Sequence, residues 1–198
     1  MLLYRVFPYL AAAAPGEPGH PGYVHGPQGK GRLDNSSEYA CWYLSAEASG
    51  AIGEVFADLG RWTPKMFDMP FLVGGERALG VYEIPNDSRV LDLDDAQHLL
   101  ERGLRPTQVI ERNRPATQAW ALKIFDERDA DGSRRWDGVR WWSYHRPQWR
   151  IFGLWGVTPA NVAVEALDLD HPAVQDAARA LSKPLSQSQT RARGTWRR

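Results

Sequence analysis

The order of strand-like and helical segments constrains the fold of this chain more than any other feature. Apolar runs of strand length outnumber the helical stretches and do not alternate strictly with them. A doubly wound sheet requires such alternation, so we predict an α+β fold instead. The expected strands cover residues 2–7, 40–44, 78–84, 89–93, 138–143, 151–155 and 162–169.

Apolar residues at helical spacing predict the helices of this fold. The first expected helix follows Ser45, its predicted N-cap, and carries Glu54 at the margin of its apolar face. That position lets the carboxylate face a cleft rather than bulk water. The second expected helix is capped by Asp92 or Asp94. The later helices are expected at residues 94–102, 115–128 and 172–182.

Length and composition predict a single domain. Its net charge does not favour a strongly charged partner. The chain has 198 residues, of which 43% are hydrophobic and 24% charged, and its formal net charge is zero. A neutral domain has no overall field that attracts nucleic acid or an anionic membrane. No apolar run approaches the ~20 residues of a membrane span. We expect the domain to cover residues 1–182, with a flexible basic tail over 183–198.

Several kinds of chemistry can be set aside from the motifs. Cys41 is the only cysteine, so no internal disulfide can form, and this favours a cytoplasmic location. The five histidines lack metal-ligand spacing, so we predict no metal. Neither a G-x-x-x-x-G-K-[ST] loop nor a G-x-G-x-x-G turn after a strand is present. Ser143 lacks the G-x-S-x-G surroundings of a nucleophilic serine.

Two arginines occupy positions at which an anion could bind. Arg32 lies in the glycine-rich turn GKGR, and its planar guanidinium matches the geometry of a phosphate. A solvated loop arginine is the common alternative. Arg5 lies inside the apolar run LLYRVF, where a cation needs a partner. That partner is either a core carboxylate or an anionic ligand. Taken singly, Tyr43 is typical of a core tyrosine and Glu54 of a solvated carboxylate.

Four short motifs in order resemble those of the RES domain family. Its arginine strand "YRV" corresponds to 4–6, and its "GRWN" turn corresponds in part to 31–35. Its "YLA…A..E" segment corresponds to the stretch from Tyr43 to Glu54, and its serine strand to 138–143. The similarity extends over about residues 2–168. Leu33 stands where the family has an aromatic residue, so a side chain that helps to shape the pocket is expected to be missing.

The resemblance implies a fold like that of ADP-ribosyltransferases, with a split, mostly antiparallel sheet around an NAD cleft. Members of the family are toxins of bacterial toxin–antitoxin pairs that attack the nicotinamide–ribose bond of NAD. The implied acceptor is inorganic phosphate, water or a protein, and the implied protein partner is a helix-rich antitoxin. NAD is then a substrate, and no cofactor is expected.

The resemblance also implies a role for each matched residue. Glu54 stabilises the positive charge that grows on the ribose, and Ser143 positions the ribose or nicotinamide by hydrogen bonding. Arg5 and Arg32 hold the pyrophosphate. Tyr43 stacks on the nicotinamide or shapes its slot. The alternative function is a non-catalytic nucleotide-binding or protein-interaction module on the same fold.

Overall fold

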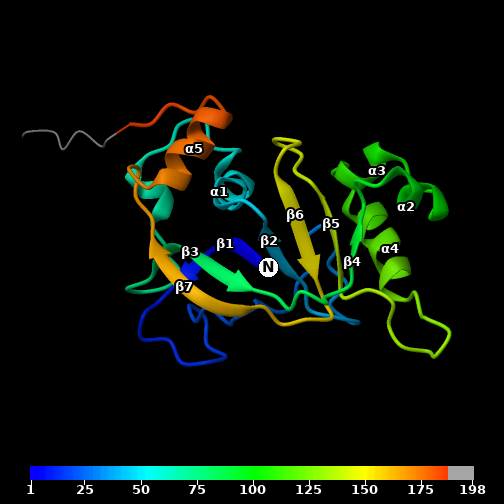
Figure 1. The fold of residues 1–198 in the computed structure, drawn as a ribbon. Helices are drawn as coiled ribbons and strands as arrows, with labels where there is room; N and C mark the ends of the chain where they lie inside the picture. The colour runs from blue at the N-terminus through cyan, green and yellow to red at the C-terminus, as the bar shows by residue number, and fades with distance from the viewer. Residues whose placement is uncertain (187–198) are drawn as a thin grey trace, which may run out of the picture.

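The computed structural model describes residues 1–186 and has an α+β fold built on a seven-stranded sheet (Figure 1). The strand order is β4-β5-β6-β2-β1-β3-β7, and every pair of neighbours is antiparallel except β4 and β5. The predicted fold class and the mostly antiparallel sheet are therefore confirmed. The strands are β1 Leu2–Tyr9, β2 Trp42–Ser45, β3 Glu76–Glu83, β4 Val90–Asp92, β5 Gly138–Trp142, β6 Arg150–Leu154 and β7 Ala160–Ala166.

The sheet opens between β1 and β2, near its middle. β1 pairs with β3 along its whole length, but its register with β2 contains the single pair Tyr4 and Ser45. The ladder does not continue to Arg5 and Leu44, so the two strands separate from that point. Backbone groups and side chains at the opening can therefore line a pocket rather than a continuous sheet.

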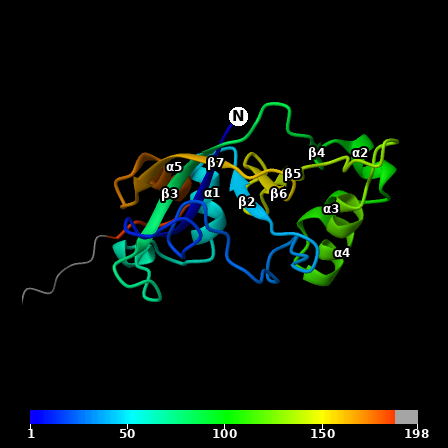
Figure 2. The same ribbon diagram turned by 90° about the horizontal axis from the view of Figure 1, so that it is seen from below.

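The helices form two groups beside the sheet (Figures 1 and 2). α1 and α5 pack on each other next to the half of the sheet that contains β1, β3 and β7. α2, α3 and α4 gather beside the β4 end. The bounds are α1 Ala48–Phe56, a 3₁₀ helix at Pro64–Phe67, α2 Ala96–Glu101, α3 Pro106–Ile110, α4 Arg114–Phe125 and α5 Pro172–Ala180.

Alternation along the strands creates a core on each face of the sheet. The larger core lies against the helices and includes the fully buried Ile52, Trp62 and Val139. The smaller core contains Leu3, Trp42, Leu44, Tyr82, Ile84, Phe152 and Leu154. The hydroxyl of Tyr82 donates to the carbonyl of Pro21 at 2.9 Å, which ties the N-terminal loop to this second face.

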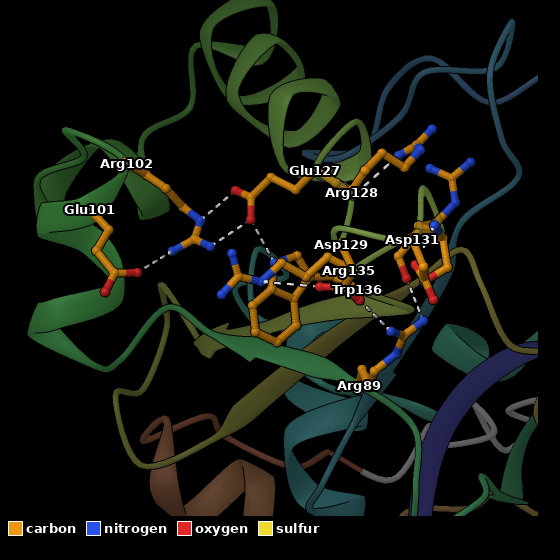
Figure 3. Close-up of polar contacts among 11 residues, drawn as sticks. Arg89, Glu101, Arg102, Glu127, Arg128, Asp129, Asp131, Arg135 and Trp136 are labelled. Atoms are coloured by element: carbon orange, nitrogen blue, oxygen red, sulfur yellow. Dashed lines mark hydrogen bonds and ion pairs between the residues drawn. The ribbon is translucent and has the colours of Figure 1, made fainter.

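A polar network fixes α2 to the chain between α4 and β5 (Figure 3). The guanidinium of Arg102 donates to both carboxylate oxygens of Glu127, at 2.8 and 2.7 Å. The indole N–H of Trp136 donates to the same carboxylate at 2.8 Å. Two-pronged arginine–carboxylate pairs have a fixed geometry, so this network holds the helical group in place beside the sheet.

Both predicted helix caps are wrong, because the N-cap residue is Glu47 in α1 and Asp95 in α2. Ser45 is the last residue of β2, and Glu47 occupies the N-cap position of α1. Asp95 caps α2 by accepting from the amide of Gln97, whereas Asp92 accepts from the amide of Asp94 in the preceding turn. Several adjacent Ser and Asp side chains can each bond to nearby amides, so sequence alone does not select among them.

The chain near residues 162–186 also differs from the sequence-based prediction. β7 ends at Ala166 rather than at 169, because Leu167 and Leu169 turn into the core while most of the strand is exposed. After α5, Leu185 forms a parallel bridge with Trp62, and Ser186 donates to the carbonyl of Trp62. The part of the expected tail at 187–198 lies outside the described residues. Within residues 1–186, no helix is long and apolar enough to cross a membrane.

Candidate active site

The opening between β1 and β2 leads into a pocket of about 310 Å³, which we call the site pocket. Four of the predicted residues line it: Arg5, Arg32, Tyr43 and Glu54. They come from β1, from the loop before β2, from β2 and from α1. The fifth, Ser143, follows β5 and reaches the site through a hydrogen bond to Glu54. The structure thus brings all five residues together, although they span most of the sequence.

Glu54 is held by Ser143 at the edge of the site pocket. The Ser143 hydroxyl donates to Oε1 of Glu54 at 2.5 Å and accepts from the amides of His145 at 3.0 Å and Arg146 at 3.4 Å. Ser143 is buried, while the Glu54 side chain is exposed. Because two amides donate to the serine oxygen, its proton is directed at the carboxylate. Ser143 therefore orients one oxygen of Glu54 and leaves the other oxygen for a ligand.

Two glycines allow α1 to approach the sheet closely enough for this contact. A β-carbon added at Gly50 would overlap the hydroxyl of Ser45, and one added at Gly53 would overlap the ring of Trp149. Any larger residue would therefore push the helix away from the end of β2 and from Trp149, which precedes β6. Glu54 follows Gly53 directly, so the close packing of the glycine also sets the position of the carboxylate.

Tyr43 braces the turn that carries Arg32. Its hydroxyl donates to Oδ1 of Asp34 at 2.6 Å and accepts from the amide of Leu33 at 2.8 Å. The other oxygen of Asp34 accepts from the amide of Gly31 at 2.6 Å. Burial raises the pKa of Tyr43, so the phenol stays protonated and can donate this bond. Tyr43 also lines the site pocket, while its hydroxyl forms hydrogen bonds within the turn.

The guanidinium of Arg32 forms its hydrogen bonds with backbone carbonyls of the protein. Nη1 donates to the carbonyls of Val109 at 2.5 Å and Glu111 at 2.8 Å, and Nη2 donates to that of Ile110 at 3.2 Å. These carbonyls lie at the C-terminal end of α3, where the helix dipole is negative. Burial lowers the pKa of Arg32 to about 10, so it remains charged near pH 7. Arg32 thus joins α3 to the pocket wall.

Arg5 lies at the opening of the sheet and faces the second core. Its guanidinium stacks over the ring of Trp42 at 5.0 Å and donates to the carbonyl of Tyr23 at 3.3 Å. Burial lowers its pKa. Within residues 1–186 no carboxylate forms an ion pair with Arg5. Of the two partners left open by the sequence, the core carboxylate is therefore absent from the described chain.

Arg114 lines the site pocket and was missed by sequence reasoning. It is the first residue of α4, and its Nη1 is buried without a hydrogen-bond partner in the part of the chain that the structure describes. Its charge also helps to lower the pKa of Arg32, after burial. A sequence signal was present, because a cation at a helix N-terminus opposes the helix dipole. Such a residue calls for a local explanation.

Leu33, which stands where the family has an aromatic residue, packs in the core and is not among the residues that line the site pocket. Its side chain is fully buried, and a β-carbon added at Gly153 would overlap its Cδ1. Cys41 lies beside the same glycine. The exchange of an aromatic residue for leucine therefore changes a core contact against β6, and the pocket wall is formed by other residues.

The described chain contains no group of side chains suited to metal binding and no reactive thiol. Within residues 1–186, no group of three or more His, Cys, Asp or Glu side chains is placed to hold a metal ion. Cys41 is buried, and burial raises the pKa of its thiol. A protonated, inaccessible thiol is not a nucleophile. The polar groups available to a ligand are thus guanidinium groups, a carboxylate and hydroxyl groups.

The fold and the site together define an α+β domain whose pocket lies at the opening of a mostly antiparallel sheet and carries a serine-held glutamate. The family model of the RES domain matches residues 2–192. The chain therefore belongs to the RES domain family, and the resemblance seen in the sequence is confirmed. A comparison with curated proteins finds no matching relative.

Proposed function

We propose that the site pocket binds NAD and breaks the bond between its nicotinamide and ribose. The observation that carries this proposal is the Glu54 carboxylate, held by a buried serine inside a pocket that also contains arginines. The pocket volume of about 310 Å³ is at the lower end of the range of small-molecule sites. It suits the reacting half of the dinucleotide and leaves the adenosine half outside.

In the proposed reaction, the C1′–N bond of the nicotinamide riboside breaks and its electron pair leaves with the nitrogen. The pyridinium ring becomes neutral nicotinamide, and positive charge develops on the ribose. The free oxygen of Glu54 stabilises that charge, as carboxylates do in glycoside cleavage. Electrostatic groups aimed at a developing charge commonly contribute a factor of ~10²–10³ in rate. Ser143 acts by orienting Glu54, and the ring of Tyr43 packs on the nicotinamide.

An acceptor oxygen completes the reaction by bonding to the same ribose carbon. If phosphate attacks, the product is ADP-ribose with a phosphate on that carbon. If water attacks, the product is free ADP-ribose and a proton is lost. If a protein group attacks, the product is an ADP-ribosylated protein. In every case NAD is consumed as a substrate. Membership of the RES family supports a toxin in a toxin–antitoxin pair, with a helix-rich antitoxin that covers the pocket.

A non-catalytic nucleotide-binding or protein-interaction module is the second candidate. One observation favours it. Arg32 donates hydrogen bonds to three backbone carbonyls, so its contribution to ligand binding is mainly its positive charge. The two candidates differ in a single measurable quantity, the release of nicotinamide.

The test is to incubate the purified chain with NAD, with and without phosphate, and to follow free nicotinamide. We expect release by the wild-type chain and a loss of at least ~10²-fold in Glu54→Gln, because the stabilising charge is removed. Glu83→Gln is the control, since Glu83 is an exposed residue at the end of β3. Absence of release under both conditions would reject the enzymatic proposal and leave the non-catalytic module.

A further inference from the structure

Arg114 lines the site pocket, and one nitrogen of its guanidinium has no hydrogen-bond partner in the described chain. Its Nη1 is buried and makes no hydrogen bond within residues 1–186. A buried donor without a partner is unfavourable, and more so when it is charged. Such groups are uncommon in folded proteins and call for a ligand, an ion or a water.

The surroundings of Arg114 do not neutralise it. Arg32 is close enough for the charge of Arg114 to contribute to its lowered pKa, so two cations share this wall of the pocket. Arg114 forms no ion pair with a carboxylate of residues 1–186. Glu54 lines the same pocket, but one of its oxygens is taken by Ser143.

The position of Arg114 at the start of α4 adds to the positive potential. α4 runs from Arg114 to Phe125, and its N-cap is Asn113, which accepts from the amide of Ala116 at 3.3 Å. The N-terminal end of a helix carries partial positive charge and attracts anions. A cationic side chain at this end is therefore unfavourable in the empty protein and favourable once an anion is bound.

We propose that Arg114 binds a phosphate-type oxyanion inside the site pocket, and this inference rests on the proposed function in assigning that oxyanion to the reactants. Its forked donors suit a tetrahedral oxyanion. Arg32 supplies charge beside it, with its own donors bound to α3. The oxyanion is either inorganic phosphate that attacks the ribose or the pyrophosphate of the dinucleotide.

The first experiment measures binding without any turnover. Phosphorus NMR line broadening is recorded for inorganic phosphate and for pyrophosphate with the full chain, with Arg114→Gln and with Arg114→Lys. We expect at least one of the two anions to bind the wild-type chain, with affinity at least tenfold weaker in Arg114→Gln and partly restored in Arg114→Lys. The control is Lys123→Gln, an exposed cation on the same helix.

Thermal unfolding of the same variants separates loss of the site from loss of the fold. Arg114 is partly buried and its Nη1 has no partner within residues 1–186, so its removal should leave the melting temperature of Arg114→Gln equal to or above that of the wild-type chain. Equal anion affinity in the wild-type chain and a folded Arg114→Gln overturns the proposal. So does the absence of binding by both anions to the wild-type chain.

Steady-state kinetics distinguish the two sources of the oxyanion. If inorganic phosphate binds to Arg114, Arg114→Gln raises the KM for phosphate at least tenfold and leaves the KM for NAD unchanged. If the pyrophosphate binds there, the KM for NAD rises instead. A chain that binds these anions through Arg114 but releases no nicotinamide contradicts the proposed function alone. A chain that cleaves NAD equally well with Arg114→Gln, and binds anions equally well, contradicts only this inference.

Discussion

Replacement of Ser143 by alanine tests whether this serine acts through Glu54. The substitution removes one oxygen that donates to the Glu54 carboxylate at 2.5 Å and accepts from the amides of His145 and Arg146. Alanine is smaller than serine, so it fits the buried position without a clash. The fold therefore loses hydrogen bonds, and the carboxylate loses its orientation.

The size of both effects follows from the contacts that are lost. A hydrogen bond to a charged group contributes about 1.5–3 kcal/mol, and an amide left unpaired costs about 1–3 kcal/mol. Because all three contacts are only part-buried, water replaces part of what is lost, and we expect the free energy of unfolding to fall by about 1–3 kcal/mol in total. If the bond to Glu54 matters equally for the transition state, the rate falls by a factor of ~10–150, since about 1.4 kcal/mol corresponds to tenfold.

The assay is nicotinamide release at saturating and at limiting NAD, for Ser143→Ala, Glu54→Gln and the double variant. Because we propose that Ser143 acts through the carboxylate of Glu54 and not on the ligand directly, kcat should fall while KM changes little. Once Glu54 is replaced, further loss of Ser143 should cost almost nothing, so the two effects should be strongly non-additive. Ser37→Ala, on an exposed loop, is the control.

Two results would refute this reasoning. Additive losses in the double variant would mean that Ser143 acts on the substrate independently of Glu54. A Ser143→Ala chain with unchanged kcat and reduced stability would mean that the serine serves only the turn at residues 143–146.

Two further predictions concern packing and ionisation. Gly53→Ala places a methyl group against the Trp149 ring and should lower the free energy of unfolding by about 1–3 kcal/mol. Gly60→Ala is the control, because Gly60 has open space around it and the change should have little effect. Thermal unfolding of both variants measures the difference. Burial raises the pKa of Tyr82 to about 12, above the ~10 of an unfolded tyrosine, so its contribution to stability is complete below pH 10 and is lost as the pH rises toward 12. Tyr82→Phe should therefore lose less stability than the wild-type chain between pH 10 and 12, measured by denaturant unfolding, and equal slopes in the two proteins would contradict this account.

Periodicity in the sequence was sufficient to predict the fold class and most of the strands, because each apolar face leaves its own local pattern. The helix caps were not predictable, since adjacent Ser and Asp side chains compete for the same amides. α3 was also missed. Its five residues are too few to show a helical period, and it is held in place by a distant residue, Arg32.

Only part of the site could be predicted from the sequence. Some of its residues belong to short motifs, whereas others are recognised only by their contacts in the folded chain. Glu54 and Tyr43 were found because short motifs in a fixed order mark them, and the structure brings both to one pocket. The hydrogen bond between Ser143 and Glu54 joins residues 89 positions apart, so no local pattern reveals it. Arg114 belongs to no motif that we matched. Its place at a helix N-terminus is the one signal in the sequence, whereas the buried nitrogen without a partner in residues 1–186 exists only once the chain is folded.

The arginines of the site differ in what their donors contact, and this difference bears on the proposed reaction. Arg5 bonds to a loop carbonyl and stacks on an indole, and Arg32 bonds to the end of α3. Arg114, which lines the pocket, has a nitrogen that no group in the described part of the chain pairs with. A pocket with an unpaired cationic donor and one oriented carboxylate favours a ligand that is anionic at one end and becomes cationic at the other. NAD meets both conditions, because its pyrophosphate is negative and its ribose gains positive charge as nicotinamide leaves.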